Sequence, residues 1–339
     1  MPEEQENQIE RREPGGGIGR RSDVVRRGMN AAAYVRELVA RRKAGVQSTA
    51  PAASISLELA REWGSRGNAA GYFFAPDRLA LDGKGNVYVS EWGNHRIQVF
   101  DPQGRFLFKW GIQGNGEGQF ELTSGLALGN GGNVYVAEWG NSRIQVFDPQ
   151  GRFLFKWGSE GHGDGQFANP GELALDNKGN VYVADRGNAR IQVFNDQGHF
   201  LFKWGAKGSE AGQFLHPNGI VLDRENNVYV AEVMNHRIQA FDRQGQFLRT
   251  WGELGEQSGQ FRSPDGLAVD TEDNVYVVDS GNLRIQVFDA QGRFRLQWGA
   301  TDEEGDQLAG VALDKENNVY VTDLTNDRVQ VLKQTSSDV

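Results

Sequence analysis

The chain of 339 residues has no cysteine, few prolines and no long hydrophobic run. The absence of cysteine excludes disulfides and thiolate metal sites, and it agrees with a reducing compartment. No apolar segment approaches the roughly 20 residues that a membrane-spanning helix needs. Charged residues begin at Glu3, which is unlike a signal peptide. We therefore expect a cytoplasmic protein with no membrane contact.

Positive charge is scarce in most of the chain. Residues 1–53 contain 10 Lys and Arg against 7 Asp and Glu, whereas residues 54–339 contain 26 against 38. Binding to nucleic acid depends on clustered Lys and Arg that contact phosphates. The acidic composition of residues 54–339 therefore disfavours nucleic acid as a partner.

The chain repeats one segment six times. The phrase NVYV recurs every 47 residues, and its sixth copy follows after 44; the copies open at Asn86, Asn133, Asn180, Asn227, Asn274 and Asn318. A second series with a 47-residue spacing consists of tryptophans: Trp63, Trp110, Trp157, Trp204, Trp251 and Trp298. Self-similarity at a period of this size is typical of repeat and propeller architectures.

Each repeat reads as four short strands, here called a to d. In one copy they are a, Gly125 to Leu128; b, Asn133 to Glu138; c, Arg143 to Phe147; and d, Phe153 to Gly158. Val, Ile, Tyr and Phe dominate them, and apolar and polar residues alternate, which indicates β-strands. Polar turns such as Asp101 to Gly104 separate c from d.

The first segment of the repeat region corresponds to the last strand of a repeat rather than to the first. Ile55 to Gly64 matches strand d, and the sixth copy, which ends near Leu332, lacks that strand. We therefore predict an all-β fold: a six-bladed β-propeller with four antiparallel strands per blade, in which the N-terminal strand completes the last blade. Such closure protects the edge strands that an open array would expose.

Residues 1–54 form an N-terminal extension ahead of the propeller at 55–339. Most of the extension is polar and reads as flexible, and residues 47–54 read as a linker. Residues 29–43 are rich in alanine, with apolar side chains on one side, and they predict an amphipathic helix. This helix either packs on the propeller or makes a second contact with a partner.

The repeated pattern resembles the NHL-repeat family over Ile55 to Leu332. Its residues are NVYVxDxxNxRIQVFDxxGxFLxxWGxxGxxxGQFxxPxGLALD, matched in order by six copies. The resemblance implies a six-bladed propeller whose upper face, made by the b–c and d–a loops, binds partners. Known NHL domains include protein-interaction modules, RNA-binding modules of tripartite-motif proteins, sensor domains of bacterial kinases and a zinc-dependent amidating lyase. The resemblance therefore specifies fold more firmly than function.

Residues that recur in every repeat are expected to be structural. An acidic residue ends strand b and an arginine opens strand c in all six copies, and an asparagine lies between them. A carboxylate and a guanidinium on either side of a tight loop can pair and satisfy its backbone groups. The six tryptophans are likewise expected to pack between blades or on the outer rim rather than to bind ligands.

Positions on the same loops that differ between repeats are better candidates for a binding site. The candidate partner-binding residues on the b–c loops are Trp92, His95, Trp139, Arg186 and His236. Tryptophan and arginine are enriched at the anchor points of protein interfaces. The alternative is that these side chains only cover the neighbouring d–a loops.

A second set of candidates is predicted to ring the mouth of the central channel. These residues are Asp77, Arg78, Glu172, Asn218 and Asp265. Arg78 and Glu172 replace the glycine that starts strand a in the other four blades, and one interpretation is that they pair and plug the opening. Alternatively, the oxygen-bearing side chains hold a hard cation such as Ca²⁺.

The sequence contains no catalytic motif, so we expect no catalytic residues, no metal and no cofactor apart from the Ca²⁺ alternative. The five histidines are too dispersed for a zinc site, which needs three or four ligands around one point. The leading hypothesis is a non-enzymatic scaffold or sensor module that binds a protein or peptide partner through the upper face. The alternatives are a metal-dependent lyase or lactonase-type enzyme with its site at the channel mouth and, disfavoured by charge, an RNA-binding module.

Overall fold

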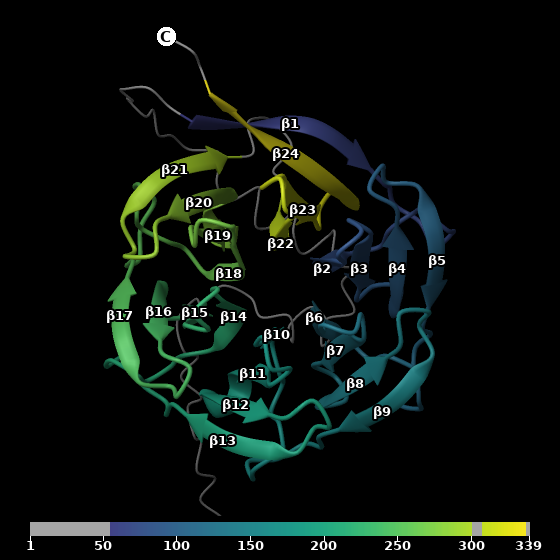
Figure 1. Ribbon diagram of the computed structural model, residues 1–339, viewed down its shortest axis with the longest axis horizontal. Helices are drawn as coiled ribbons and strands as arrows, with labels where there is room; N and C mark the ends of the chain where they lie inside the picture. Colours follow the sequence, from purple (N-terminus) through teal and green to yellow (C-terminus); the bar gives the residue numbers. More distant parts are fainter. Residues whose placement is uncertain (1–54, 300–306, 337–339) are drawn as a thin grey trace, which may run out of the picture.

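The computed structural model describes residues 55–299 and 307–336. These residues form six four-stranded antiparallel sheets arranged as blades around a central axis (Figure 1). The predicted six-bladed β-propeller is therefore confirmed. The predicted extension at 1–54, including the helix at 29–43, lies outside the described residues. Among the described residues, no helix reaches the length and hydropathy of a membrane span.

The blades follow one another along the chain, and each runs from the axis outward in the order a, b, c, d. The first three blades are β2 (Pro76–Leu81), β3 (Val87–Glu91), β4 (Arg96–Phe100) and β5 (Phe106–Trp110); β6 (Thr123–Leu128), β7 (Val134–Glu138), β8 (Arg143–Phe147) and β9 (Phe153–Trp157); and β10 (Leu173–Leu175), β11 (Val181–Asp185), β12 (Arg190–Phe194) and β13 (Phe200–Trp204).

The other three blades repeat this order. They are β14 (Pro217–Leu222), β15 (Val228–Glu232), β16 (Arg237–Phe241) and β17 (Phe247–Trp251); β18 (Pro264–Val269), β19 (Val275–Asp279), β20 (Arg284–Phe288) and β21 (Phe294–Gly299); and β22 (Leu308–Leu313), β23 (Val319–Asp323), β24 (Arg328–Ser336) and β1 (Ile55–Trp63). Two short 3-10 helices, Arg186–Asn188 and Ser280–Asn282, occupy b–c loops.

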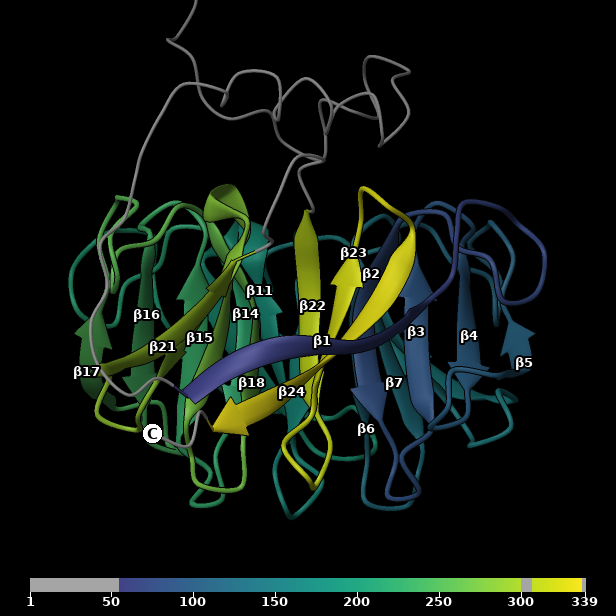
Figure 2. The same ribbon diagram turned by 90° about the horizontal axis from the view of Figure 1, so that it is seen from above.

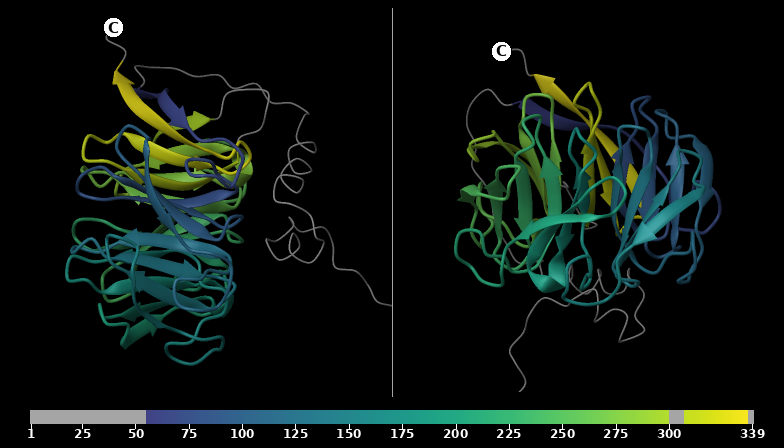
Figure 3. Two further views of the ribbon diagram at one scale, coloured as in Figure 1. Left: turned by 90° about the vertical axis from the view of Figure 1, so that its right-hand side faces the viewer. Right: turned by 60° about the horizontal axis from the view of Figure 1, so that its bottom comes forward.

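The sixth blade closes the ring with strands from both ends of the propeller. Strand β1 pairs antiparallel with β24, from Ile55 opposite Ser336 to Trp63 opposite Val329. Figure 2 shows the two strands crossing the outer side of the sixth blade, and the views in Figure 3 show them lying together. The predicted closure by the N-terminal strand is confirmed.

The apolar core lies between the blades rather than inside each one. Six buried clusters each combine side chains from two neighbouring sheets. Strands b and c are buried along nearly their whole length, and only strand d alternates, as in β5. The strands predicted from the alternating pattern are present, but in b and c both faces are buried because neighbouring blades cover both sides of their sheet.

The repeated tryptophans join successive blades, as predicted. The Trp110 ring of the first blade lies 5.7 Å from the Phe147 ring of the second and 6.4 Å from Tyr88 of its own blade. It also packs on the c–d turn of the second blade, where a Cβ at Gly151 would lie 2.7 Å from the indole. Gly151 additionally has φ +79°, so both its backbone and this contact favour glycine.

Strands a crowd together around the axis. A Cβ at Gly219 would lie 1.9 Å from the Asp265 carbonyl oxygen of the next blade, and one at Gly266 would lie 2.5 Å from the Ala309 carbonyl oxygen. Glycine is therefore needed where strand a approaches its neighbour. Arg78 and Glu172 occupy this same position in their own blades, which makes them structural exceptions.

The closure predicts opposite results for two N-terminal truncations. A chain that starts at residue 52 retains every described strand and should keep its melting temperature within about 2 °C of the full chain. A chain that starts at residue 65 loses β1 and exposes β24. Its melting temperature should fall by about 10 °C or more, since each kcal/mol is worth roughly 2–4 °C in a domain of this size. Calorimetry of both truncations checks this, and equal stability of the two would contradict the closure.

Candidate functional site

The upper face is formed by the b–c loops and by the d–a loops that connect successive blades. In the second blade these loops are tied together through Glu138, which is fully buried. Its carboxylate accepts hydrogen bonds from Arg143 (2.6 Å), Asn141 (2.6 Å) and Gln145 (2.8 Å). Arg143 and Gln145 also donate to backbone carbonyls of the d–a loop at 111–122. We call this arrangement the loop clamp.

The arginine–carboxylate pair of the loop clamp recurs in every blade. Its Arg Nε to carboxylate distances run from 2.5 to 2.9 Å, in the pairs Arg96–Glu91, Arg143–Glu138, Arg190–Asp185, Arg237–Glu232, Arg284–Asp279 and Arg328–Asp323. These charges are thus used to hold the loops, as the sequence predicted, and the clamp fixes the positions of the variable residues beside them.

Two of the predicted partner-binding residues meet in one small cavity. Trp92 follows strand b of the first blade, and Trp139 follows strand b of the second. Together with Leu122 and Thr123 they line a cavity of about 10 Å³ between these two blades at the upper face. Both indole nitrogens and the Thr123 hydroxyl are buried, and they have no hydrogen-bond partner within residues 55–299 and 307–336.

Thr123 was missed by sequence reasoning, although the signal was present. The equivalent residue is proline in four of the other blades and leucine in one: Pro76, Pro170, Pro217, Pro264 and Leu308. Thr123 is therefore the polar exception at its position, and its side chain is 1% exposed. Its neighbour Leu122 has φ +53°, and the Leu122 carbonyl oxygen accepts the Trp139 backbone N–H at 2.9 Å.

A further aromatic side chain packs on the b–c loop that carries Trp92. The Phe74 ring packs on Gly93, the residue after Trp92, where an added Cβ would lie 2.8 Å from the ring. The Arg66 guanidinium lies 5.0 Å from the Phe74 ring centroid. Tyr72 and Ile112 are exposed at 47% and 63% on the adjoining d–a loops. The loops of the first two blades thus carry aromatic residues, Tyr72, Phe74, Trp92 and Trp139, at positions where the other repeats have none.

The remaining candidates on the upper face do not line this cavity. His236 is three blades from His95, and its Nδ1 accepts the Ser263 backbone N–H at 3.0 Å, so it bridges two loops. Burial lowers the pKa of His236, and the Arg262 charge lowers it further. The His95 Nδ1 is buried and has no partner in the described part of the chain. Arg186 opens a 3-10 helix in the third blade.

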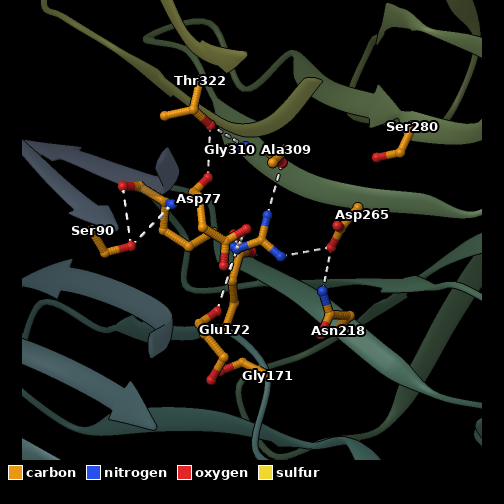
Figure 4. A network of polar contacts seen from close by, with 12 residues as sticks. Asp77, Ser90, Gly171, Glu172, Asn218, Asp265, Ser280, Ala309, Gly310 and Thr322 are labelled. Atoms are coloured by element: carbon orange, nitrogen blue, oxygen red, sulfur yellow. Dashed lines mark hydrogen bonds and ion pairs between the residues drawn. The ribbon is translucent and has the colours of Figure 1, made fainter. Parts of the chain in front are cut away.

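The predicted channel residues converge on Arg78, which is 1% exposed. Figure 4 shows the other four, Asp77, Glu172, Asn218 and Asp265. The Arg78 guanidinium lies 2.7 Å from Asp265 and 3.0 Å from Glu172, and 3.9 Å from its neighbour Asp77. Asn218 donates a hydrogen bond to Asp265. The five residues are therefore brought together, and the Arg78 guanidinium contacts the Glu172 carboxyl group, as the sequence suggested.

Arg78 also connects blades through their backbones. It donates hydrogen bonds to the Ala309 carbonyl oxygen at 2.8 Å and to the Ser124 carbonyl oxygen at 3.3 Å. These acceptors belong to the sixth and second blades, on either side of its own. Glu172 and Asp265 belong to the third and fifth blades. The Arg78 side chain of the first blade therefore contacts four other blades.

The charges around Arg78 do not balance, because three carboxylates face one guanidinium. Burial disfavours the charged guanidinium, but Asp265, Glu172 and Asp77 outweigh this and raise the pKa of Arg78. Burial raises the pKa of Glu172 to about 8; Arg78 opposes this increase and Asp265 adds to it. Glu172 therefore holds a proton more readily than an ordinary glutamate does.

The Ca²⁺ alternative stays a prediction. Within residues 55–299 and 307–336, no group of three or more His, Cys, Asp or Glu side chains is arranged to hold a metal ion. The Asp265 and Glu172 oxygens contact Arg78 instead.

Comparisons with known families agree with this architecture. NHL repeats match residues 75–100, 124–147 and 261–288, and a family described as a 6-bladed beta-propeller matches residues 176–254. The fold and its loop face thus define a six-bladed β-propeller. The chain carries NHL repeats, which identifies the repeated unit of that propeller.

A curated protein shares part of the repeat sequence. The B-box type zinc finger protein ncl-1 of Caenorhabditis elegans is 44% identical over 48 residues. The match spans 14% of this chain and 6% of that protein, far less than two thirds of its length. It therefore supports the similarity of the repeat unit only.

Solved structures share the fold at low sequence identity. A virginiamycin B lyase from Staphylococcus aureus has a TM-score of 0.60 and 13% identity, covering 82% of this chain and 99% of that one. A structural genomics protein from Bacteroides thetaiotaomicron has a TM-score of 0.63 and 16% identity, covering 82% and 76%. A streptogramin B lyase has a TM-score of 0.57 and 14% identity, covering 76% and 78%. These likenesses show the fold alone.

The raised pKa of Glu172 predicts a dependence of stability on pH. A group whose pKa is higher in the folded than in the unfolded state stabilises the fold while it is protonated. For Glu172 this stabilisation is fully present below the unfolded-state pKa of 4.5 and is lost as the pH rises through the folded-state pKa of about 8. The melting temperature of the wild type should therefore fall between pH 5 and pH 8.5 more steeply than that of Glu172→Gln, which carries no titrating proton.

The matched control is Glu225→Gln, at an exposed glutamate in an a–b turn. It should leave the slope of melting temperature against pH unchanged. Parallel curves for wild type and Glu172→Gln in differential scanning fluorimetry would show that Glu172 is not protonated in the folded protein.

Proposed function

We propose that this propeller is a protein-interaction module that binds a peptide segment of a partner on its upper face, over the first and second blades. The observation that carries the proposal is the meeting of Trp92 and Trp139 in one cavity, with the exposed Tyr72 and Ile112 on the adjoining d–a loops. Tryptophans in partly closed pockets are typical anchor points of protein interfaces. In this proposal the upper face binds the partner and catalyses no reaction.

The rigidity of this face supports the proposal. The loop clamp holds Glu91 and Glu138, the residues preceding the two tryptophans, with several hydrogen bonds each. A binding surface that is ordered before the partner arrives loses less conformational entropy on binding. The upper face over these two blades is therefore suited to a preorganised interaction.

The excess of acidic residues supports a protein or peptide partner over a nucleic acid. Residues 54–339 contain 38 Asp and Glu against 26 Lys and Arg. Such a surface repels phosphate backbones and favours partners that are neutral or basic. A peptide with apolar anchor side chains and basic flanking residues fits both the aromatic residues and the charge.

Replacing both tryptophans should weaken binding strongly. Peptides are selected from a displayed random library on the immobilised full chain, and the dissociation constant of an enriched peptide is then measured by fluorescence anisotropy. Trp92→Ala/Trp139→Ala should raise this constant at least about 10-fold, because truncating an interface anchor costs on the order of 1–2 kcal/mol or more.

The matched control changes the equivalent positions three blades away. Val233→Ala/Ser280→Ala alters the b–c loops of the fourth and fifth blades and should leave the dissociation constant within about twofold. Equal affinity of the tryptophan variant and the wild type, or an equal loss in the control, would overturn the proposed site.

A further inference from the structure

We propose that residues 29–43 of this chain dock on its own upper face, over the first and second blades, and are displaced when a partner peptide binds there. This inference deepens the proposed function and rests on it, since it names a ligand for the same face within the chain itself. Residues 29–43 lie outside the described residues, so their sequence, the described face and the length of chain between the two carry the inference.

The segment at 29–43 has the composition that the upper face favours in a peptide. Its sequence, MNAAAYVRELVARRK, contains four Lys and Arg against one Glu. Tyr34 and Leu38 are four residues apart, as are Val35 and Val39, so the helix predicted there places these apolar side chains on one side. Amphipathic segments of this kind bind by laying their apolar side on a hydrophobic surface. The chain therefore contains a peptide with apolar anchors and basic flanks.

The described face offers apolar surface over the first two blades. Tyr72 and Ile112 are exposed at 47% and 63% on d–a loops. Trp92 and Trp139 are partly exposed on the b–c loops of the same two blades. Single exposed apolar residues are ordinary, but several on adjoining loops mark an interaction site. The apolar side of the segment thus has a surface to cover.

The loops on either side of the second blade are acidic. The d–a loops at 111–122 and 158–169 contain no Lys or Arg and carry four carboxylates: Glu117, Glu121, Glu160 and Asp164. Glu117 and Glu160 are exposed, whereas Asp164 pairs with Lys203 of the third blade. Complementary charge attracts a basic segment to this part of the face and orients it there. The four basic residues of the segment match these loops.

The chain between the segment and the propeller is long enough for docking within one molecule. Strand β1 has nine residues from Ile55 to Trp63 and leads into the d–a loop that carries Tyr72. Such a strand is about 30 Å long, at roughly 3.3 Å per residue. The connection at 44–54 can span roughly 36–40 Å when extended, at 3.3–3.6 Å per residue. It can therefore return along β1 from Ile55 to the upper face.

A weak contact is sufficient for docking within one chain. A short flexible connection gives a tethered ligand an effective concentration on the order of 1 mM. A segment that binds with a dissociation constant of about 100 µM would then occupy roughly nine-tenths of the faces, and a partner would have to displace it.

Limited digestion of the full chain with trypsin tests the docking, because the segment contains its own cleavage sites. Docking should protect the bonds after Arg36 and Arg41, whereas the bond after Arg21 lies outside the segment. Tyr34→Ser/Leu38→Ser removes two apolar anchors. We expect it to raise the cleavage rate at Arg36 and Arg41 about 3- to 10-fold, since cleavage follows the undocked fraction, and to leave the rate at Arg21 unchanged.

A variant of the face tests the same contact from the other side. Tyr72→Ser/Ile112→Ser changes two exposed side chains and leaves the core intact. It should raise the cleavage rate at the two protected bonds as the segment variant does, without altering the cleavage sites themselves. The matched control is Val233→Ala/Ser280→Ala on the b–c loops of the fourth and fifth blades, which should leave both rates within about twofold of the wild type.

Binding of the selected peptide tests the competition. Tyr34→Ser/Leu38→Ser should lower the dissociation constant of that peptide about 3- to 10-fold, because the internal competitor is removed. Val24→Ser/Val25→Ser makes the same kind of change outside the segment, and it should alter neither this constant nor the cleavage rates.

Four results would overturn the inference: unchanged cleavage in the segment variant; a response to the segment variant without one to the face variant, as for docking elsewhere; loss of protection on dilution, as for docking on a second copy; or an unchanged dissociation constant of the selected peptide. The proposed function fails separately, when Trp92→Ala/Trp139→Ala binds that peptide as the wild type does. Peptide binding that depends on the tryptophans but not on residues 29–43 would retain the binding face and remove the internal ligand.

Discussion

The buried loop clamp is the interaction on which the rest of the upper face depends. In each blade a fully buried carboxylate is held by an arginine at 2.5 to 2.9 Å, and the arginine is in turn bonded to backbone carbonyls of the preceding d–a loop in most blades. A buried charge is tolerated only when it is paired and fully hydrogen-bonded. The clamp therefore holds the b–c and d–a loops together. Because the clamp residues fix the loop structure, the other side chains on these loops can vary between blades.

The axis of the propeller depends on a second constraint, which is the crowding of strands a. Four blades place glycine at the tightest approach, whereas Arg78 and Glu172 fill the channel with charged side chains instead. The guanidinium satisfies carbonyl oxygens of two neighbouring blades and contacts carboxylates of two more. The repeated residues thus hold each blade, and the exceptional residues either join blades at the axis or form the cavity on the upper face.

Much of the fold could be predicted from the sequence because the sequence of one blade occurs in six copies. The period identified the blades, and the displaced first strand identified the closure. The burial of both faces of strands b and c was missed, since alternation cannot show what covers a sheet. Trp92 and Trp139 were found as variable loop residues, but their shared cavity was not, because it depends on the packing between blades. Thr123 was overlooked, although it stands where four other blades have proline. The contact between Arg78 and Asp265 could not be predicted, because it depends on the width of the channel.

The central claim is that the upper face over the first two blades binds a peptide. Hydrogen–deuterium exchange of the full chain, with and without a peptide selected on it, tests this claim most directly. The account predicts added protection in the loops at 92–95, 111–122 and 139–142. Protection confined to the equivalent loops at 233–236 and 280–283, or to the c–d turns on the opposite face, would contradict it.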